Sequence, residues 1–215
     1  GGGKRIAFSL ISRAAEQRAC EIAFGRSDLP DYAFEKAELL VNFGADFIET
    51  WGNTVQNARR FADMHAYNDG KKNRCIHVGP HQSLSGARAD EWLPANPGTE
   101  AMIALAMAHA IHQRDPRHDF LSDYLSPYSP ALVAGETGIS AEKIQALAEE
   151  FHQASSLAVA GGTWNSSEQA TATQVAVFIL NAAAGNLGKT LRFHESEQPS
   201  EDTSHSQILQ LLSDL

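Results

Sequence analysis

The stretch that decides the fold is Leu39–Trp51, which reads LLVNFGADFIETW. A short apolar run stops at Gly44, and an aspartate follows at position 46. This pattern predicts a buried strand that leads into a loop. In open α/β sheets, such loops line the crevice that receives ligands, often nucleotide phosphates. The carboxylate of Asp46 repels a phosphate, so the stretch has the shape of a binding loop without the matching charge.

Two further apolar runs, at residues 75–78 and 157–160, also end at glycines. A helical pattern over residues 54–67 separates the first two strands, which gives a strand–helix–strand unit long enough for a parallel crossover. Near-continuous apolar strands are typical of parallel sheets covered on both faces. The sequence therefore predicts an α/β fold of three layers, with mostly parallel strands near 39–43, 75–78 and 157–160.

The later part of the chain is predicted to be mainly helical. Residues 91–97 contain two prolines and are interpreted as a linker. Thr99 is placed to cap a helix that starts at Glu100, and Ser140 is placed to cap a second one. A long helix is expected over residues 169–184.

Composition limits the function. The length of 215 residues fits one α/β domain or two small lobes. The net charge of −9 argues against nucleic acid as a partner. Its two cysteines, Cys20 and Cys75, form no cluster, so this chain cannot itself ligate an iron–sulfur cluster or a cysteine-built zinc ion. The longest apolar run, residues 101–111, is too short to cross a bilayer.

Catalytic and metal-binding motifs are weak in this sequence. His109 and His112 lie three apart, and His77 and His81 lie four apart, but neither pair has the HExxH carboxylate. His109 is interpreted as a hydrogen-bonded core residue. No GxSxG, GxGxxG or GxxxxGK[ST] motif occurs, so nucleophilic catalysis and nucleotide binding have no direct support from the residues.

Taken in order, the segments resemble the central portion of the molybdopterin oxidoreductase family. The resemblance rests on IHVGPHQSLSGARADEWLPANPGTEAMIALAMAHAI at residues 76–111, where family members carry Ala-Asp and then PGTD at the start of an alanine-rich helix. SPYSPALVAGETGISAEKIQALAEEF at 126–151 and ILNAAAGNLGK at 179–189 resemble the segments that follow. The resemblance implies a Rossmann-like domain of the kind found centrally in formate dehydrogenase and DMSO reductase. It spans about residues 7–189.

Three loops depart from the family pattern. Where the family has Gly-Ser-Asn-Pro, this chain has Gly44-Ala45-Asp46-Phe47, and where the family has Asp-Pro-Arg, it has Gly79-Pro80-His81. The family's GNiGrpGgG is replaced by GNLGKTLRF at 185–193. A carboxylate ~5 Å from a phosphate costs roughly 3 kcal/mol at an effective dielectric near 20. The simplest interpretation is a scaffold that has lost its dinucleotide.

The resemblance implies seven positions that would face the family's dinucleotide, in degenerate form: Gly44, Ala45, Asp46, Gly79, His81, Ser83 and Glu100. The family cofactor is molybdenum bis-pyranopterin guanine dinucleotide, with iron–sulfur clusters on regions outside this chain. We expect no catalytic residue, no metal ligand and no cofactor in this fragment. The sequence is most similar to the branch formed by the fused molybdopterin-like and iron–sulfur subunit of alternative complex III and its relatives.

The function expected from this branch is a cofactor-free structural domain of a respiratory electron-transfer complex. Its partners would be the rest of its own polypeptide and other subunits of a membrane-associated complex, at the periplasmic face of a bacterial inner membrane. The expected division is an α/β domain over 1–190, an acidic polar loop over 191–206 and the start of a helix over 207–215. The alternatives are a fragment of an active molybdenum oxidoreductase and an unrelated α/β ligand-binding module.

Overall fold

The fold is built on a four-stranded parallel sheet in the order β6-β5-β2-β7. The structure is a computed structural model that describes residues 13–68, 70–118, 120–162, 169–193, 209–210 and 212–213. Its strands are β1 (Asp31–Tyr32), β2 (Leu39–Phe43), β3 (Tyr67–Asn68), β4 (Lys71–Lys72), β5 (Arg74–Val78), β6 (Glu91–Leu93), β7 (Ser156–Ala160) and β8 (Leu191–Arg192). Its helices are α1 (Ala14–Phe24), α2 (Thr54–His65), α3 (Leu84–Ala87), α4 (Glu100–Arg114), α5 (Leu121–Leu125), α6 (Pro130–Thr137), α7 (Ala141–Gln153) and α8 (Ala170–Ala184), with 3-10 turns η1 (Phe34–Lys36) and η2 (Ser126–Tyr128).

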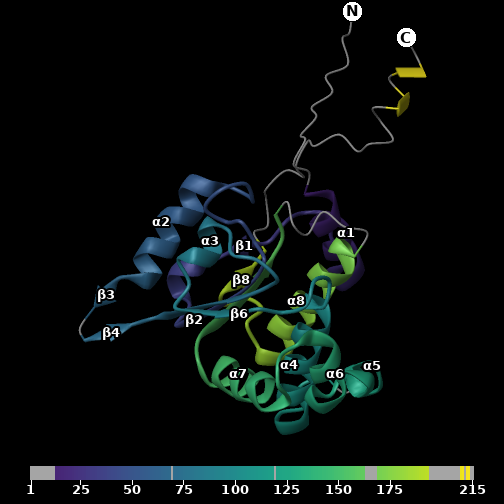
Figure 1. Cartoon of the computed structure of the whole chain (residues 1–215). Helices are drawn as coiled ribbons and strands as arrows, with labels where there is room; N and C mark the ends of the chain where they lie inside the picture. The colour runs from purple at the N-terminus through teal and green to yellow at the C-terminus, as the bar shows by residue number, and fades with distance from the viewer. Residues whose placement is uncertain are drawn as a thin grey trace, which may run out of the picture.

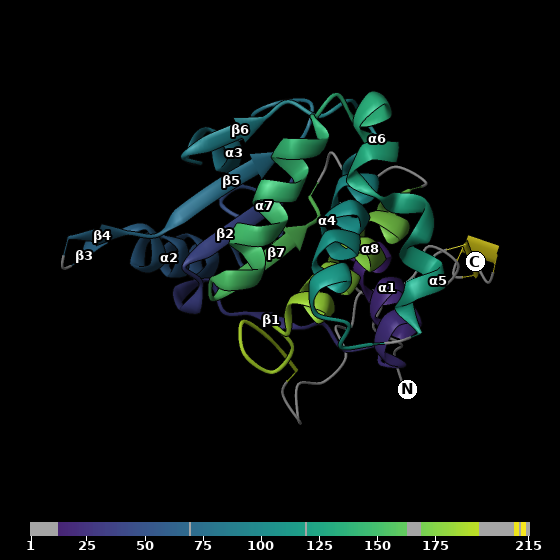
Figure 2. The same cartoon turned by 90° about the horizontal axis from the view of Figure 1, so that it is seen from below.

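Helices cover both faces of the sheet, as the continuous apolar strands predict. Figures 1 and 2 show α2 and α3 on one side and α4, α6 and α7 on the other. Apolar residues of β2, β5 and β7 enter one of two apolar clusters, because successive side chains point to opposite faces. In β2, Val41 joins the cluster of α4 and α7, and Leu40 joins that of α1 and α2. The α/β fold and the three predicted parallel strands are therefore confirmed. The finer likeness to Rossmann-like and DMSO reductase-like domains stays a prediction.

The strand order reverses between β2 and β7. The chain runs from β2 outward through β5 to β6, and then returns to place β7 on the other side of β2. Such a reversal opens a crevice between the loops that leave β2 and β7. Here those loops begin at Gly44 and Gly161, so this point is where a ligand of the fold would be held.

Two local predictions are corrected. Residues 91–97 are not a plain linker, because β6 forms there and pairs with β5, with Ile76 opposite Glu91. Thr99 occupies the N-cap position of α4, but its hydroxyl donates to the carbonyl of Asn96 at 2.7 Å instead of capping the helix. The Ser140 cap is confirmed, since its hydroxyl accepts the N–H of Lys143.

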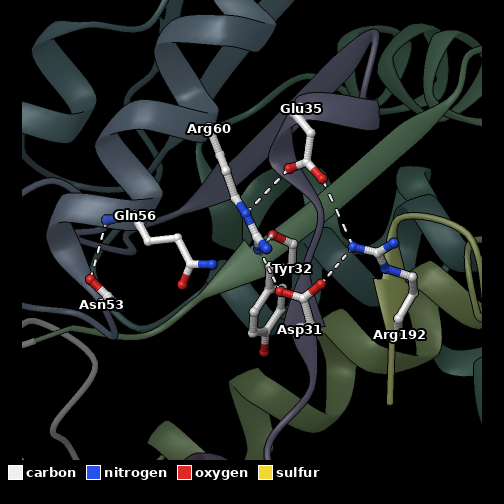
Figure 3. Close-up of polar contacts among 7 residues, drawn as sticks. All are labelled: Asp31, Tyr32, Glu35, Asn53, Gln56, Arg60 and Arg192. Carbon is white, nitrogen blue, oxygen red and sulfur yellow. Dashed lines mark hydrogen bonds and ion pairs between the residues drawn. The ribbon is translucent and has the colours of Figure 1, made fainter. Parts of the chain in front are cut away.

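A ring of four charged side chains joins the two ends of the fold (Figure 3). Arg60 of α2 pairs with Asp31 and Glu35, and Arg192 of β8 pairs with the same two carboxylates. The β1–β8 pair places Asp31 opposite Arg192. The ring therefore fixes the antiparallel β1–β8 ribbon against α2.

The described helices include none that is long and apolar enough to span a bilayer. Most of the expected acidic loop, from residue 194 onward, lies outside the described residues, and Leu191–Arg192 at its start forms β8. Residues 209–210 and 212–213 are helical, within the segment expected to begin a helix. The division at residues 190 and 206 stays a prediction.

Candidate functional site

The loop after β2 is held in shape by a buried asparagine. Gly44 has a φ of 74°, in the left-handed region that glycine adopts without strain. The amide of Asn42 donates to the Ala45 carbonyl at 3.0 Å, and its oxygen accepts the Ala45 N–H at 2.6 Å. Both polar groups of Ala45 are thus bonded inside the chain. The turn after β2 is therefore closed by hydrogen bonds between Asn42 and Ala45.

Asp46 lies inside the molecule, with 3% of its surface exposed. Its carbonyl accepts the N–H groups of Glu49, Thr50 and Trp51 at 2.9 to 3.0 Å. A Cβ added to Gly162 would lie 2.8 Å from the Asp46 carboxylate. The carboxylate therefore lies against the loop that follows β7, where the loops after β2 and β7 approach each other.

The loop after β5 is tied to the sheet through His77. The imidazole Nδ1 lies 3.2 Å from the Asn42 amide, and Nε2 lies 2.8 Å from the His81 carbonyl. Burial is the main cause that lowers the pKa of His77, so its ring is neutral at neutral pH. The Gly79 carbonyl accepts the indole N–H of Trp92 at 2.9 Å. Predicted positions 79 and 81 are therefore bonded to residues of this chain.

Ser83 is the N-cap of α3, and its hydroxyl accepts the N–H of Gly86 at 3.2 Å. The same helix is joined to the loop after β2. The Ser85 hydroxyl accepts the Ile48 N–H at 3.1 Å, and the Glu49 carboxylate accepts the Leu84 N–H at 3.0 Å. The loops after β2 and β5 are thus linked directly to each other.

Glu100 is the seventh predicted position, and it lies on a different kind of element. It begins α4 and is 8% exposed. A carboxylate in the first turn of a helix is favoured by the helix dipole. The other six predicted positions lie on the loops after β2 and β5, so the structure gathers those six on two loops and carries Glu100 on a helix.

Trp51 is the residue that the sequence-based search missed. It is 4% exposed, and a Cβ added to Gly161 would lie 2.2 Å from its indole nitrogen. Its ring meets that of Tyr32 at 4.9 Å, and the guanidinium of Arg13 lies 5.4 Å from the indole centre. The indole therefore fills the space where the loops after β2 and β7 approach. A tryptophan followed by glycine just beyond a strand-end loop was the signal that could have identified it.

The third altered loop belongs elsewhere in the fold. Asn186 donates to the Ser156 hydroxyl at 3.1 Å, and Thr190 donates to the Ser156 carbonyl at 2.6 Å. Ser156 begins β7, whereas the loops of Gly44 and Gly161 follow strand ends. The turn at 185–193 thus lies at the amino-terminal end of β7, away from the loops that follow the strands.

In the part of the chain that the structure describes, the two histidine pairs lie in surroundings that do not form a metal site. Within the described ranges, no group of three or more His, Cys, Asp or Glu side chains could hold a metal ion. His112 bonds to the Ser122 hydroxyl at 2.8 Å, but no described group bonds to the buried Nδ1 of His109. The interpretation of His109 as a hydrogen-bonded core residue is therefore wrong at that nitrogen.

Two of the similar curated proteins are molybdopterin-binding-like or molybdopterin-containing subunits of reductases. The chain is 29% identical over 163 residues to the menaquinone reductase molybdopterin-binding-like subunit of Nitratidesulfovibrio vulgaris, a match that covers 74% of this chain and 24% of the relative. It is 24% identical over 136 residues to the molybdopterin-containing subunit of the arsenate respiratory reductase of a Shewanella species, covering 58% of this chain and 14% of the relative. No family model matches the sequence.

A solved structure supports the fold. Acetylene hydratase from Pelobacter acetylenicus superposes with a TM-score of 0.61 at 19% identity, over 80% of this chain and 24% of that protein. At this identity the likeness speaks for the fold alone. The chain spans about a quarter or less of the length of the relatives reported above.

Proposed function

Because the chain belongs to the molybdopterin oxidoreductase family, we propose that it is a structural domain of a respiratory electron-transfer subunit and holds no molybdenum cofactor itself. In this role it would keep neighbouring iron–sulfur parts in position without carrying out chemistry. The proposal gives this chain the role expected for the cofactor-free molybdopterin-like subunits, the branch that its sequence resembles most.

The observation that carries the proposal is the use of polar groups at the predicted cofactor positions. The Ala45 amide bonds to Asn42, the Gly79 carbonyl bonds to Trp92, and the Ser83 hydroxyl caps α3. A dinucleotide is held by free amides and hydroxyls that replace its hydration. Groups already bonded within the chain must first lose those bonds, which costs about 1 kcal/mol each. These internal bonds support a domain that holds no family cofactor.

The names of the relatives support the wider setting. The relative from Nitratidesulfovibrio vulgaris is described as a molybdopterin-binding-like subunit of a menaquinone reductase. By analogy, the proposed partners are the rest of a longer polypeptide and other subunits of a membrane-associated redox complex. The proposed location is the periplasmic face of a bacterial inner membrane.

Metal and pterin analysis of the full natural polypeptide, purified with its partner subunits, tests the proposal. We expect iron, no stoichiometric molybdenum and no extractable pterin. Molybdenum at one equivalent together with a guanylated pterin would contradict the proposal and favour the second candidate, a working molybdenum oxidoreductase. A structure of the intact assembly would then place the dinucleotide beside residues 44–47 and 79–81.

The second candidate rests on Glu100, which keeps a buried carboxylate at a family position. In a working enzyme, Glu100 and Ser83 would touch the dinucleotide. Family membership removes the third alternative, an unrelated α/β binding module.

A further inference from the structure

We propose that the crevice between β2 and β7 is a slot for a planar heteroaromatic ring, and that the chain fills this slot with the indole of Trp51. The indole slot is formed by Arg13, Tyr32 and Gly161. The assignment rests on the proposed function, since it gives a physical reason why no dinucleotide is bound there. Trp51 is the residue that closes the crevice, and planar heteroaromatic rings are the molecules that the opened crevice would bind.

Among the described residues, three walls of different chemistry surround the indole. The Gly161 backbone forms the first wall, and it has no room for a side chain because an added Cβ would meet the indole nitrogen at 2.2 Å. The Tyr32 ring forms the second, meeting the indole at 61° with a centroid distance of 4.9 Å. The guanidinium of Arg13 forms the third, 5.4 Å from the indole centre.

These walls suit a flat aromatic ring. A glycine backbone allows close approach, a tyrosine ring packs against an aromatic edge, and a guanidinium is attracted to a π-face. Proteins use stacked rings and arginines in the same way to hold nucleobases. The ligand class that matches the slot is therefore a planar heteroaromatic ring, such as an indole or a purine.

The indole is anchored by its own backbone. The Trp51 N–H donates to the Asp46 carbonyl at 3.0 Å, and the Trp51 carbonyl accepts the Asn57 amide at 3.1 Å. Gly52 follows with a φ of 69°, which allows the chain to turn away into α2. A ligand ring would have to displace a side chain that is fixed on both sides of its Cα.

Replacing Trp51 with alanine tests the slot, with free indole as the probe. Loss of a buried tryptophan should lower the melting temperature by about 10 °C. Millimolar indole should then raise the melting temperature of Trp51→Ala by ~3 °C or more, because a ligand that binds only the folded state stabilises it. Wild type and the control Trp92→Ala, which removes an indole that is 39% exposed, should not respond. Absence of any indole effect on Trp51→Ala would overturn the proposal.

A double-mutant cycle with Gly161→Ala gives an independent test that does not depend on ligand binding. The backbone strain of alanine at φ 139° is the same in both backgrounds, so the cycle isolates the clash with the indole. Gly161→Ala should lower the melting temperature clearly more in wild type than in Trp51→Ala. Equal shifts in the two backgrounds would overturn the proposal. If Trp51→Ala does not fold, Trp51→Leu serves in both experiments.

Failure of the proposed function and failure of this inference give different results. Molybdenum and pterin in the natural assembly would contradict the cofactor-free role even if indole restores Trp51→Ala. Wild-type protein that responds to indole or to guanosine diphosphate as strongly as Trp51→Ala would show that the slot is open, whatever the metal analysis finds.

Discussion

Asn181 takes the place of a neighbouring strand for β7, which is the last strand of the sheet. Its side-chain oxygen accepts the Ala158 N–H at 3.1 Å, and its amide donates to the Ala158 carbonyl at 2.9 Å. Asn181 and Ala158 are both fully buried. At Ala158, both backbone groups on the outer edge of β7 are therefore satisfied by one side chain of α8.

Replacing Asn181 with leucine should lower the free energy of unfolding by about 2–4 kcal/mol, because two buried backbone groups lose their partners. Urea unfolding followed by circular dichroism measures this. Gln145→Leu, an exposed change of the same kind on α7, serves as the control and should have little effect. A loss below 1 kcal/mol for Asn181→Leu would argue against the edge-satisfying role.

Asp46→Asn combined with Gly79→Asp removes the charge at one loop and restores a family carboxylate at the other. We expect this pair not to create tight guanine-nucleotide binding. Trp51 still fills the crevice, and an aspartate at φ 158° is strained at position 79. Isothermal calorimetry with guanosine diphosphate checks this, and micromolar binding would contradict it.

At the scale of elements, Asp90 joins three of them. Its carboxylate accepts from His65 of α2 at 2.8 Å, from Lys72 of β4 at 2.6 Å and from the Cys75 N–H of β5 at 2.9 Å. Partial burial, the largest single influence, favours the neutral form, but the Lys72, Cys75 and His65 contacts outweigh it and lower the pKa of Asp90 to about 2. Figures 1 and 2 show that β3 and β4 project from the body, so this contact holds the base of the projecting hairpin.

A carboxyl whose pKa is lowered by folding stabilises the protein above its unfolded pKa and loses that effect as pH falls. The contribution of Asp90 should be complete above about pH 4 and lost as pH falls towards 2. Asp90→Asn should cost about 1 kcal/mol at pH 7 after solvent screening. Its unfolding free energy should also change less with pH than that of wild type between pH 4 and 2. Urea midpoints measured across this range test the assignment, and parallel pH profiles would refute it.

The elements found from sequence are those with a local signal. β2, β5 and β7 have apolar runs that end at glycine, and α7 has a serine cap, so their patterns are visible without tertiary information. β6 is three residues long and precedes Pro94, and its pairing with β5 is what makes it a strand. Such a strand has no periodicity to detect.

At the scale of the whole molecule, both cysteines lie in the apolar cluster between the sheet and helices α1 and α2. Burial is the main cause that raises the pKa of Cys20 and of Cys75 to about 12 each. A thiol with this pKa has roughly 1000-fold less thiolate at pH 8 than a free cysteine.

The native protein should therefore react slowly with Ellman's reagent, and both thiols should react promptly in guanidinium chloride. The absorbance of the released thiolate measures the two rates at pH 8. Fast reaction of either cysteine in the native protein would show that this cluster opens readily.

The candidate site could be predicted only in part, because its closure depends on contacts between distant segments. The Gly44 and Gly79 loops follow apolar runs, so their place at the sheet edge was visible in the sequence. The contact between Trp51 and Gly161 depends on the position of β7 beside β2. The place of the turn at 185–193, at the amino-terminal end of β7, depends on it too. No local pattern carries that information.

The β1–β8 ribbon has a consequence for how the fold is completed. Asp31 faces Arg192, and the rings of Phe24 and Phe193 lie 5.0 Å apart, so the ribbon joins segments that are far apart in sequence. Contacts between such distant segments carry the loop-closure entropy of the chain between them. The ribbon is therefore expected to be among the last parts of the fold to form.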